Sequence, residues 1–138
     1  MQRAILVVDD HESLRRSLRE WLQKEYADCE ILDAASGEEA ITVAEDRPLS
    51  LVVMDIGLPG ISGIEATRQL KLLAPKLPVV ILSVYGGDSY RADAQEAGAV
   101  AYVQKRELQK ELLPALSKLI SSVEDRPNGP LQQSAEEG

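Results

Sequence analysis

The stretch VVMDIGLPGISG runs from Val52 to Gly63 and joins a hydrophobic run to a loop punctuated by glycine and proline. The predicted strand 49–54 is apolar except for Ser50, as expected of a strand that is covered on both faces. It ends abruptly at one carboxylate, Asp55. What a carboxylate does at the end of a buried strand depends on which other charged residues the fold brings to the same place.

Short apolar runs alternate with helical patterns on both sides of this stretch. The other predicted strands are 4–8, 29–32, 78–83 and 99–104. The first predicted helix has its apolar stripe over 14–22, and the next three cover 36–47, 63–73 and 88–98. The last predicted helix runs from near Gln109 to 123, with Pro114 in or just after its first turn. Five strand–helix units within about 120 residues predict an α/β fold, a doubly wound parallel sheet of five strands with helices on both faces.

Composition limits the function classes. The 138 residues are 44% hydrophobic and lack Phe, so one domain can bury a core of Leu, Val, Ile and Ala. A net charge of −8 argues against nucleic acid or an anionic membrane as a partner of this chain alone. The single cysteine, Cys29, excludes an intrachain disulfide and is expected in the core.

No apolar run is long enough for a signal peptide or a membrane span, so a cytoplasmic location is expected. The periodicity stops at the end of the last helix. The domain is therefore predicted to span 1–123, and 124–138 is predicted to be a flexible tail or the start of an interdomain linker.

Polar side chains follow the predicted strands at their carboxyl ends, namely Asp9 and Asp10, Asp55, Ser83 and Lys105. Right-handed crossovers bring all these ends to one edge of the sheet. In the common order 2-1-3-4-5, the first and third strands are neighbours, so three carboxylates crowd one small space. Crowded carboxylates favour a bound cation, and hard oxygen ligands suit Mg²⁺.

A carboxylate, a cation, a hydroxyl and a lysine around one point predict a phosphoryl site. The glycines of GLPGISG have the spacing of neither a dinucleotide fingerprint nor a P-loop. The phosphoryl group is therefore expected to be carried covalently, with Asp55 as the nucleophile.

The chain resembles the receiver domain of bacterial two-component response regulators over roughly residues 3–123. The marks are LVVDDHE, VVMDIGLPGISGIE, VILSVY and EAGAVAYVQK, in this order, followed by an amphipathic last helix. The resemblance is strongest to receivers that are attached to helix-turn-helix output domains. It implies a flavodoxin-like fold, and the strand order 2-1-3-4-5 is taken from this family.

The resemblance also assigns roles to residues. Asp55 is implied as the phospho-acceptor. Asp9, Asp10, Asp55 and the backbone carbonyl of Gly57 are implied as ligands of Mg²⁺, with Mn²⁺ as the alternative ion. Lys105 and Ser83 are implied as partners of the phosphoryl group, and Ser83 and Tyr102 as switch residues. His11 is left outside this set, as a polar residue at a helix start.

The implied partner is a histidine kinase or phosphotransfer protein. A second copy could bind through the face of the fourth helix, fifth strand and fifth helix. The chain is either a stand-alone receiver or part of a longer regulator, in which case an output domain would follow Gly138. Two residues depart from the family pattern. Arg106 follows Lys105 where many receivers have a proline after a cis bond, and Val84 follows Ser83 where alanine is common.

Two alternatives to a phospho-accepting signalling domain stay open. One is an aspartate-nucleophile phosphohydrolase on a similar sheet, although the first acids are adjacent rather than D-x-D and no segment is long enough for a cap domain. The other is a receiver-like scaffold that is not phosphorylated. In the leading interpretation the chain is not an enzyme, and it catalyses only its own phosphorylation and dephosphorylation.

Overall fold

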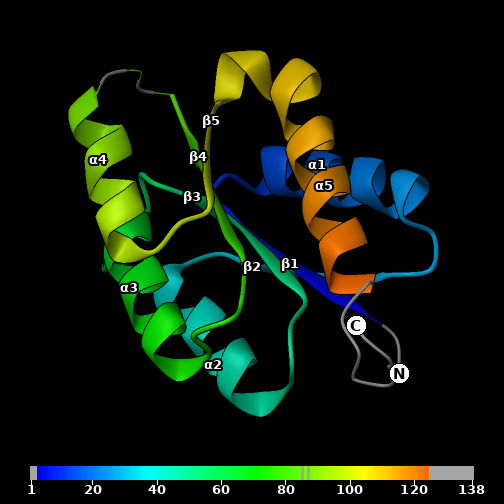
Figure 1. Cartoon of the computed structure of the whole chain (residues 1–138), viewed down its shortest axis with the longest axis horizontal. Helices are drawn as coiled ribbons and strands as arrows, with labels where there is room; N and C mark the ends of the chain where they lie inside the picture. The colour runs from blue at the N-terminus through cyan, green and yellow to red at the C-terminus, as the bar shows by residue number, and fades with distance from the viewer. Residues whose placement is uncertain (1–2, 85, 87, 125–138) are drawn as a thin grey trace.

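The computed structural model describes residues 3–84, 86 and 88–124, in which strands and helices alternate (Figure 1). Their bounds are β1 Ala4–Val8, α1 Glu12–Glu25, β2 Glu30–Ala34, α2 Gly37–Asp46, β3 Leu51–Asp55, α3 Gly63–Leu73, β4 Val79–Ser83, α4 Asp88–Ala97, β5 Ala101–Gln104 and α5 Leu113–Glu124. All five predicted strands and all five predicted helices are present. The predicted bounds 4–8 and 63–73 are confirmed, and the ends of the other elements differ from the predictions by one to a few residues. The predicted tail from 125 onward lies outside the described residues.

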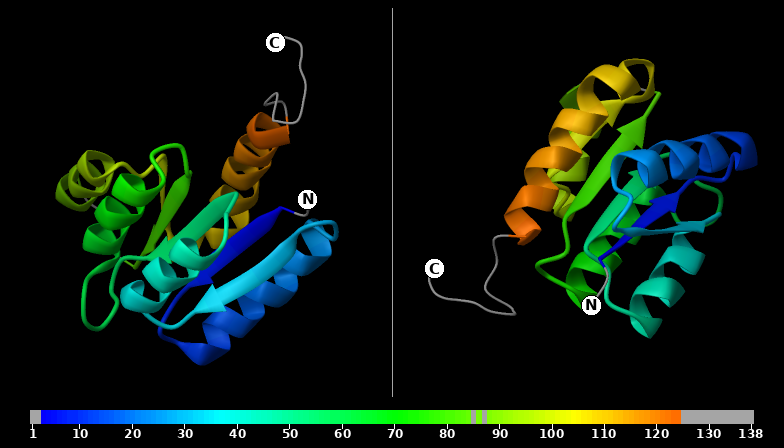
Figure 2. Two further views of the ribbon diagram at one scale, coloured as in Figure 1. Left: turned by 90° about the horizontal axis from the view of Figure 1, so that it is seen from below. Right: turned by 90° about the vertical axis from the view of Figure 1, so that its right-hand side faces the viewer.

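The strands form one parallel sheet in the order β2-β1-β3-β4-β5, which confirms the predicted topology. β2 is an edge strand, and β1 and β3 lie side by side near the centre. Helices α1 and α5 cover one face of the sheet, and α2, α3 and α4 cover the other (Figure 2). This is the doubly wound arrangement in which ligands bind outside the carboxyl ends of the strands.

The two faces of the sheet bury separate aliphatic clusters. Alternate residues of β1 show the division, since Ile5 joins the cluster under α1 and α5 while Leu6 joins the cluster under α2, α3 and α4. Cys29 is buried in the first cluster, as predicted. Because β1, β3 and β4 are buried along their whole length, their positions are fixed by apolar packing on both sides.

Local signals set several helix ends. The Ser36 hydroxyl accepts a hydrogen bond from the Glu39 backbone N–H at 3.1 Å, and the Glu39 carboxylate accepts one from the N–H of Ala35 at 2.8 Å. These bonds confirm the capping signal at the start of α2. Gly98 follows α4 with a φ of +108°, which confirms its predicted place as the helix stop.

The entry to α5 differs from the prediction. A 3₁₀ turn (Lys105–Glu107) and a π-helical turn (Leu108–Leu112) precede the helix, so helical backbone begins before Gln109. Pro114 lies in the first turn of α5, as predicted. A proline ring clashes with the carbonyl four residues before it, and a wider π-type turn accommodates this.

Among the described residues, no peptide bond is cis, and Arg106 lies within the 3₁₀ turn after β5. Within this same part of the chain, no helix combines the length and the apolar character that a bilayer-spanning segment requires.

Candidate functional site

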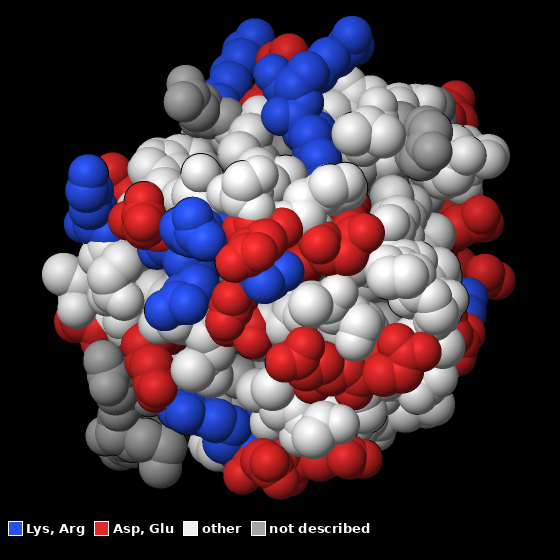
Figure 3. All heavy atoms as spheres, turned by 180° about the vertical axis from the view of Figure 1, so that it is seen from behind, with Lys and Arg blue, Asp and Glu red and all other residues white. Residues whose placement is uncertain are grey.

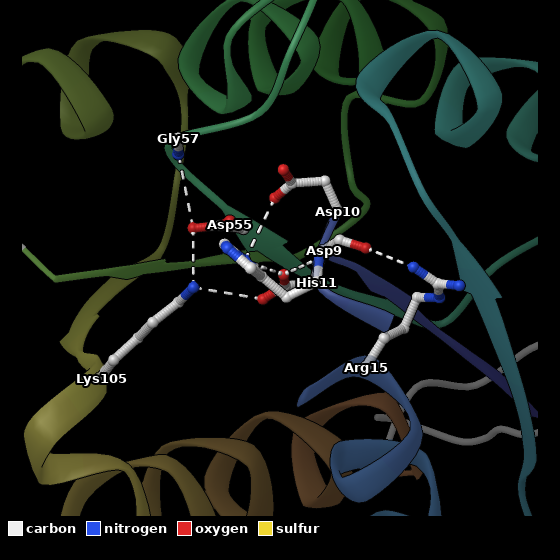
Figure 4. A network of polar contacts seen from close by, with 7 residues as sticks. All are labelled: Asp9, Asp10, His11, Arg15, Asp55, Gly57 and Lys105. Atoms are coloured by element: carbon white, nitrogen blue, oxygen red, sulfur yellow. Dashed lines mark hydrogen bonds and ion pairs between the residues drawn. The ribbon is translucent and has the colours of Figure 1, made fainter. Parts of the chain in front are cut away.

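Charged residues from three strands meet at the carboxyl edge of the sheet (Figure 4). Asp55 is the last residue of β3 and is buried, Asp9 and Asp10 follow β1, and Lys105 follows β5. The sequence predicted this meeting because parallel strands end at a common edge. The structure brings the four residues together as predicted.

Lys105 links two of the carboxylates. Its Nζ lies 3.2 Å from Oδ2 of Asp9 and 3.2 Å from Oδ1 of Asp55. The ammonium group is largely withdrawn from solvent, since the Lys105 side chain is 16% exposed. One largely buried ammonium group therefore lies between two buried carboxylates and offsets only part of their negative charge.

The pKa of Asp55 is raised above its ordinary value. Burial is the largest cause, and the neighbouring Asp9 charge adds to it. The Lys105 charge and hydrogen bond oppose the rise, as does the backbone N–H of Gly57, which donates to Asp55 Oδ1 at 3.4 Å. The Asp55 carboxylate is thus held in a place that disfavours its charge, and further positive charge there would stabilise it.

Asp9 is held from several sides. It is fully buried, and its Oδ1 accepts a hydrogen bond from the His11 backbone N–H at 2.8 Å. Arg15 of α1 donates to the Asp9 carbonyl oxygen at 2.8 Å and to Oδ2 of Asp33 in β2 at 2.9 Å. These bonds fix the turn that leads from β1 into α1.

A fifth side chain, His11, also belongs to this group, although the sequence indicated only a polar residue at a helix start. Ligand atoms of Asp9, Asp10, His11 and Asp55 all lie within 4.8 Å of one another. His11 does stand at the N-cap position of α1, but its side chain makes no capping bond, and the ring faces the acids instead. The only sequence signal was its place directly after the acid pair.

Comparison with known proteins agrees with this geometry. The family described as "Response regulator receiver domain" matches residues 5–117. The chain belongs to this family.

The relatives of this receiver domain are regulators of transcription and signalling. It is 34% identical over 117 residues to the transcriptional activator protein ExaE of Pseudomonas putida (85% of this chain, 55% of ExaE) and 30% identical over 117 residues to the response regulator UvrY of Escherichia coli K12 (85% and 54%). The chain thus spans about half the length of the curated relatives it matches.

Solved structures give the same assignment. A LuxR-family two-component response regulator from Aurantimonas sp. SI85-9A1 has a TM-score of 0.81 and 30% identity, covering 88% of this chain and 87% of that one. The response regulator TrrA from Thermotoga maritima, solved in complex with Mg²⁺–BeF, has a TM-score of 0.76 and 36% identity, covering 86% and 99%. The chain is therefore a signalling domain rather than a classical enzyme, which weighs against the phosphohydrolase alternative.

The remaining predicted residues of the receiver lie on β4 and β5. Ser83 ends β4 at the same edge as Asp55 and is fully buried. Tyr102 of β5 is partly buried against the cluster under α2, α3 and α4. The guanidinium of Arg91 in α4 lies 4.8 Å from the centre of the Tyr102 ring, and Arg91 donates to the Tyr102 carbonyl oxygen at 3.5 Å. Val84, directly after Ser83, is 69% exposed.

Proposed function

We propose that Asp55 accepts a phosphoryl group from a histidine kinase or a phosphotransfer protein. The observation that carries the proposal is the place of Asp55, buried beside Asp9 with the Lys105 ammonium 3.2 Å from both carboxylates. An Asp55 oxygen attacks phosphorus, and the bond from phosphorus to the donor nitrogen breaks. The electron pair of that bond stays on the donor imidazole, and the product is an acyl phosphate.

Asp9, Asp10, Asp55 and the backbone carbonyl of Gly57 would hold Mg²⁺, or Mn²⁺ in its place. The donor set fits, because a hard dication prefers a few oxygen ligands and the acidic ligand atoms here lie within 4.8 Å of one another. The ion, when bound, neutralises charge on the phosphoryl oxygens. Lys105 and Ser83 would donate to those oxygens from the other side.

The proposal includes a switch. Charge-assisted bonds to the phosphoryl group, worth about 1.5–3 kcal/mol each, would draw Ser83 toward Asp55 and let Tyr102 move inward. That movement would remodel the face made by α4, β5 and α5, which is the proposed surface for a partner or a second copy. Hydrolysis of the acyl phosphate by water would return the domain to its resting state.

In the whole protein, the receiver would control an output domain beyond Gly138, as the transcriptional role in the name of ExaE suggests. The receiver alone is not expected to bind nucleic acid, because its net charge is −8. Figure 3 shows acidic and basic side chains mixed over one face of the molecule. This signalling step would take place in the cytoplasm, the compartment expected of a two-component receiver.

The test is phosphorylation by a small phosphodonor with Mg²⁺, followed by intact-mass spectrometry. Wild type should gain one phosphoryl group, and Asp55→Asn should gain none. Asp28→Asn is the matched control, since the Asp28 side chain is 72% exposed and pairs with Arg3 away from the site.

Equal labelling of wild type and Asp55→Asn would contradict the assigned role of Asp55. No labelling of either protein would favour the non-phosphorylated scaffold. Sustained turnover of a phosphomonoester would favour the phosphohydrolase.

A further inference from the structure

The His11 ring has contacts that helix capping does not explain. Its Nδ1 lies 3.2 Å from Asp9 Oδ1 and 3.4 Å from Asp10 Oδ1, so it approaches two different carboxylates. The backbone N–H of His11 already donates to the same Asp9 oxygen at 2.8 Å. This bond fixes the His11 backbone against Asp9, and the ring lies among the side chains of the acid group (Figure 4).

The spacing of these atoms fits ligands of one ion. Two neighbouring ligands of an octahedral ion, each about 2.1 Å from it, lie about 3.0 Å apart, and opposite ligands lie about 4.2 Å apart. The two nitrogen–oxygen distances are only slightly longer than the first value. No two of the ligand atoms in the group lie more than 4.8 Å apart, which is not far above the second value. Small side-chain movements would bring all four residues onto one ion.

An imidazole changes which ions such a site prefers. Oxygen ligands alone suit Mg²⁺, which keeps several waters, whereas imidazole nitrogen suits first-row transition ions. His11 is well placed to add this nitrogen because its side chain is 68% exposed and can adjust at little cost. The carboxylates supply the negative charge that attracts any dication, and the His11 nitrogen adds a preference for first-row transition ions over Mg²⁺.

We infer that His11 is a nitrogen ligand that tunes this site toward a first-row transition dication, while Mg²⁺ binds to the carboxylates without it. The inference rests on the proposed cation site of Asp9, Asp10 and Asp55. His11 would thus determine ion specificity, and phosphorylation supported by Mg²⁺ would not require it.

The chain offers a clean test, because His11 is its only histidine. Untagged protein is loaded with Mn²⁺ and studied by pulsed electron paramagnetic resonance, with ¹⁵N-histidine labelling to identify the coupled nucleus. Wild type should show coupling to imidazole nitrogen, and His11→Ala should lose it. In calorimetry, His11→Ala should weaken Ni²⁺ on the order of tenfold and change Mg²⁺ affinity by less than about twofold.

Two further variants complete the design. Glu12→Gln is the matched control, since the exposed Glu12 side chain pairs with Arg16 and stays outside the acid group. It should behave as wild type. Asp10→Asn should weaken both Mg²⁺ and Ni²⁺, because the carboxylate serves either ion.

The outcomes separate the two proposals. If Mn²⁺ binds without imidazole coupling, or if His11→Ala leaves the ratio of Ni²⁺ to Mg²⁺ affinity unchanged, the role of His11 is refuted while the cation site stands. If Asp10→Asn binds every ion as wild type does, the cation site itself is wrong and the His11 inference falls with it.

Discussion

Replacing Lys105 with Met tests the electrostatic description of the site. Met is an unbranched side chain one atom shorter than Lys and carries no charge, so the buried carboxylates of Asp9 and Asp55 lose their common partner. At 3.2 Å and an effective dielectric constant of about 20, each ion pair is worth about 5 kcal/mol before desolvation is subtracted. Removing one partner of a buried ion pair lowers the free energy of unfolding by about 3–5 kcal/mol, and we expect a loss of about 3 kcal/mol for Lys105→Met.

The companion variant, Asp55→Asn, should have the opposite effect. The raised pKa of Asp55 means that its ionised form costs stability at neutral pH in the absence of a cation. Removing this charge should stabilise the fold on the order of 1 kcal/mol, as is common where a functional site is neutralised. When Lys105→Met is added to Asp55→Asn, it should lower the free energy of unfolding clearly less than it does in wild type, because only the Asp9 carboxylate then loses a partner.

The assay is urea unfolding in a buffer with chelator. A loss of about 3 kcal/mol should lower the midpoint by roughly 1–3 M. Lys118→Met on the exposed side of α5 is the control and should unfold as wild type does. Excess Mg²⁺ should recover part of the loss in Lys105→Met, because a ligand that binds only the folded state stabilises it by mass action.

The pH dependence follows from the direction of the Asp55 shift. Lys105 lowers the pKa of Asp55, so its removal raises that pKa further. A carboxyl with a raised pKa in the folded state contributes stability that is complete below its unfolded pKa of about 4 and is lost as the pH rises through the folded value. The deficit of Lys105→Met should therefore be small near pH 4 and grow toward neutral pH. If Lys105→Met loses the same free energy of unfolding near pH 4 and at neutral pH, or loses none in the presence of chelator, the assigned electrostatic role of Lys105 is refuted.

Two further predictions concern the backbone packing next to the site and the proposed switch residue Ser83. Gly63→Ala should destabilise the fold by more than about 2 kcal/mol in urea unfolding, because its Cβ would lie 2.1 Å from a backbone carbonyl oxygen at the end of β3. Gly57→Ala is the control, since its Cβ would meet nothing within 4 Å, and similar losses in both would contradict the packing argument. Ser83→Ala should still accept phosphate but show smaller amide shifts over 84–104 than wild type with a phosphoryl mimic, and a full shift would show that the hydroxyl is not the trigger.

The sequence predicted the parts of this structure that depend on burial and on chain direction. Continuous apolar runs identify the strands, and parallel strands must end at one edge, so Asp55 and Lys105 could be placed together. The bridge that Lys105 makes to Asp9 spans 96 positions, and its geometry depends on how β5 leads into the next turn. The ring of His11 was missed for a related reason. Periodicity reports which face of a helix is buried, whereas the direction of a side chain at a helix start depends on contacts outside the helix.

The charges of the site give a reason why Asp55, as the proposed acceptor, would need both Lys105 and a dication. Three carboxylates and one ammonium leave a net charge of about −2 when His11 is neutral. A phosphoryl group on Asp55 replaces one negative charge by about two, so phosphorylation without a cation would add charge to a buried site that already disfavours it. A dication brings the resting site close to neutral and makes the added charge acceptable. The two aliphatic clusters that bury β1 and β3 hold these groups at a short distance despite their repulsion, and the binding of a cation and of a phosphoryl group should therefore strengthen each other.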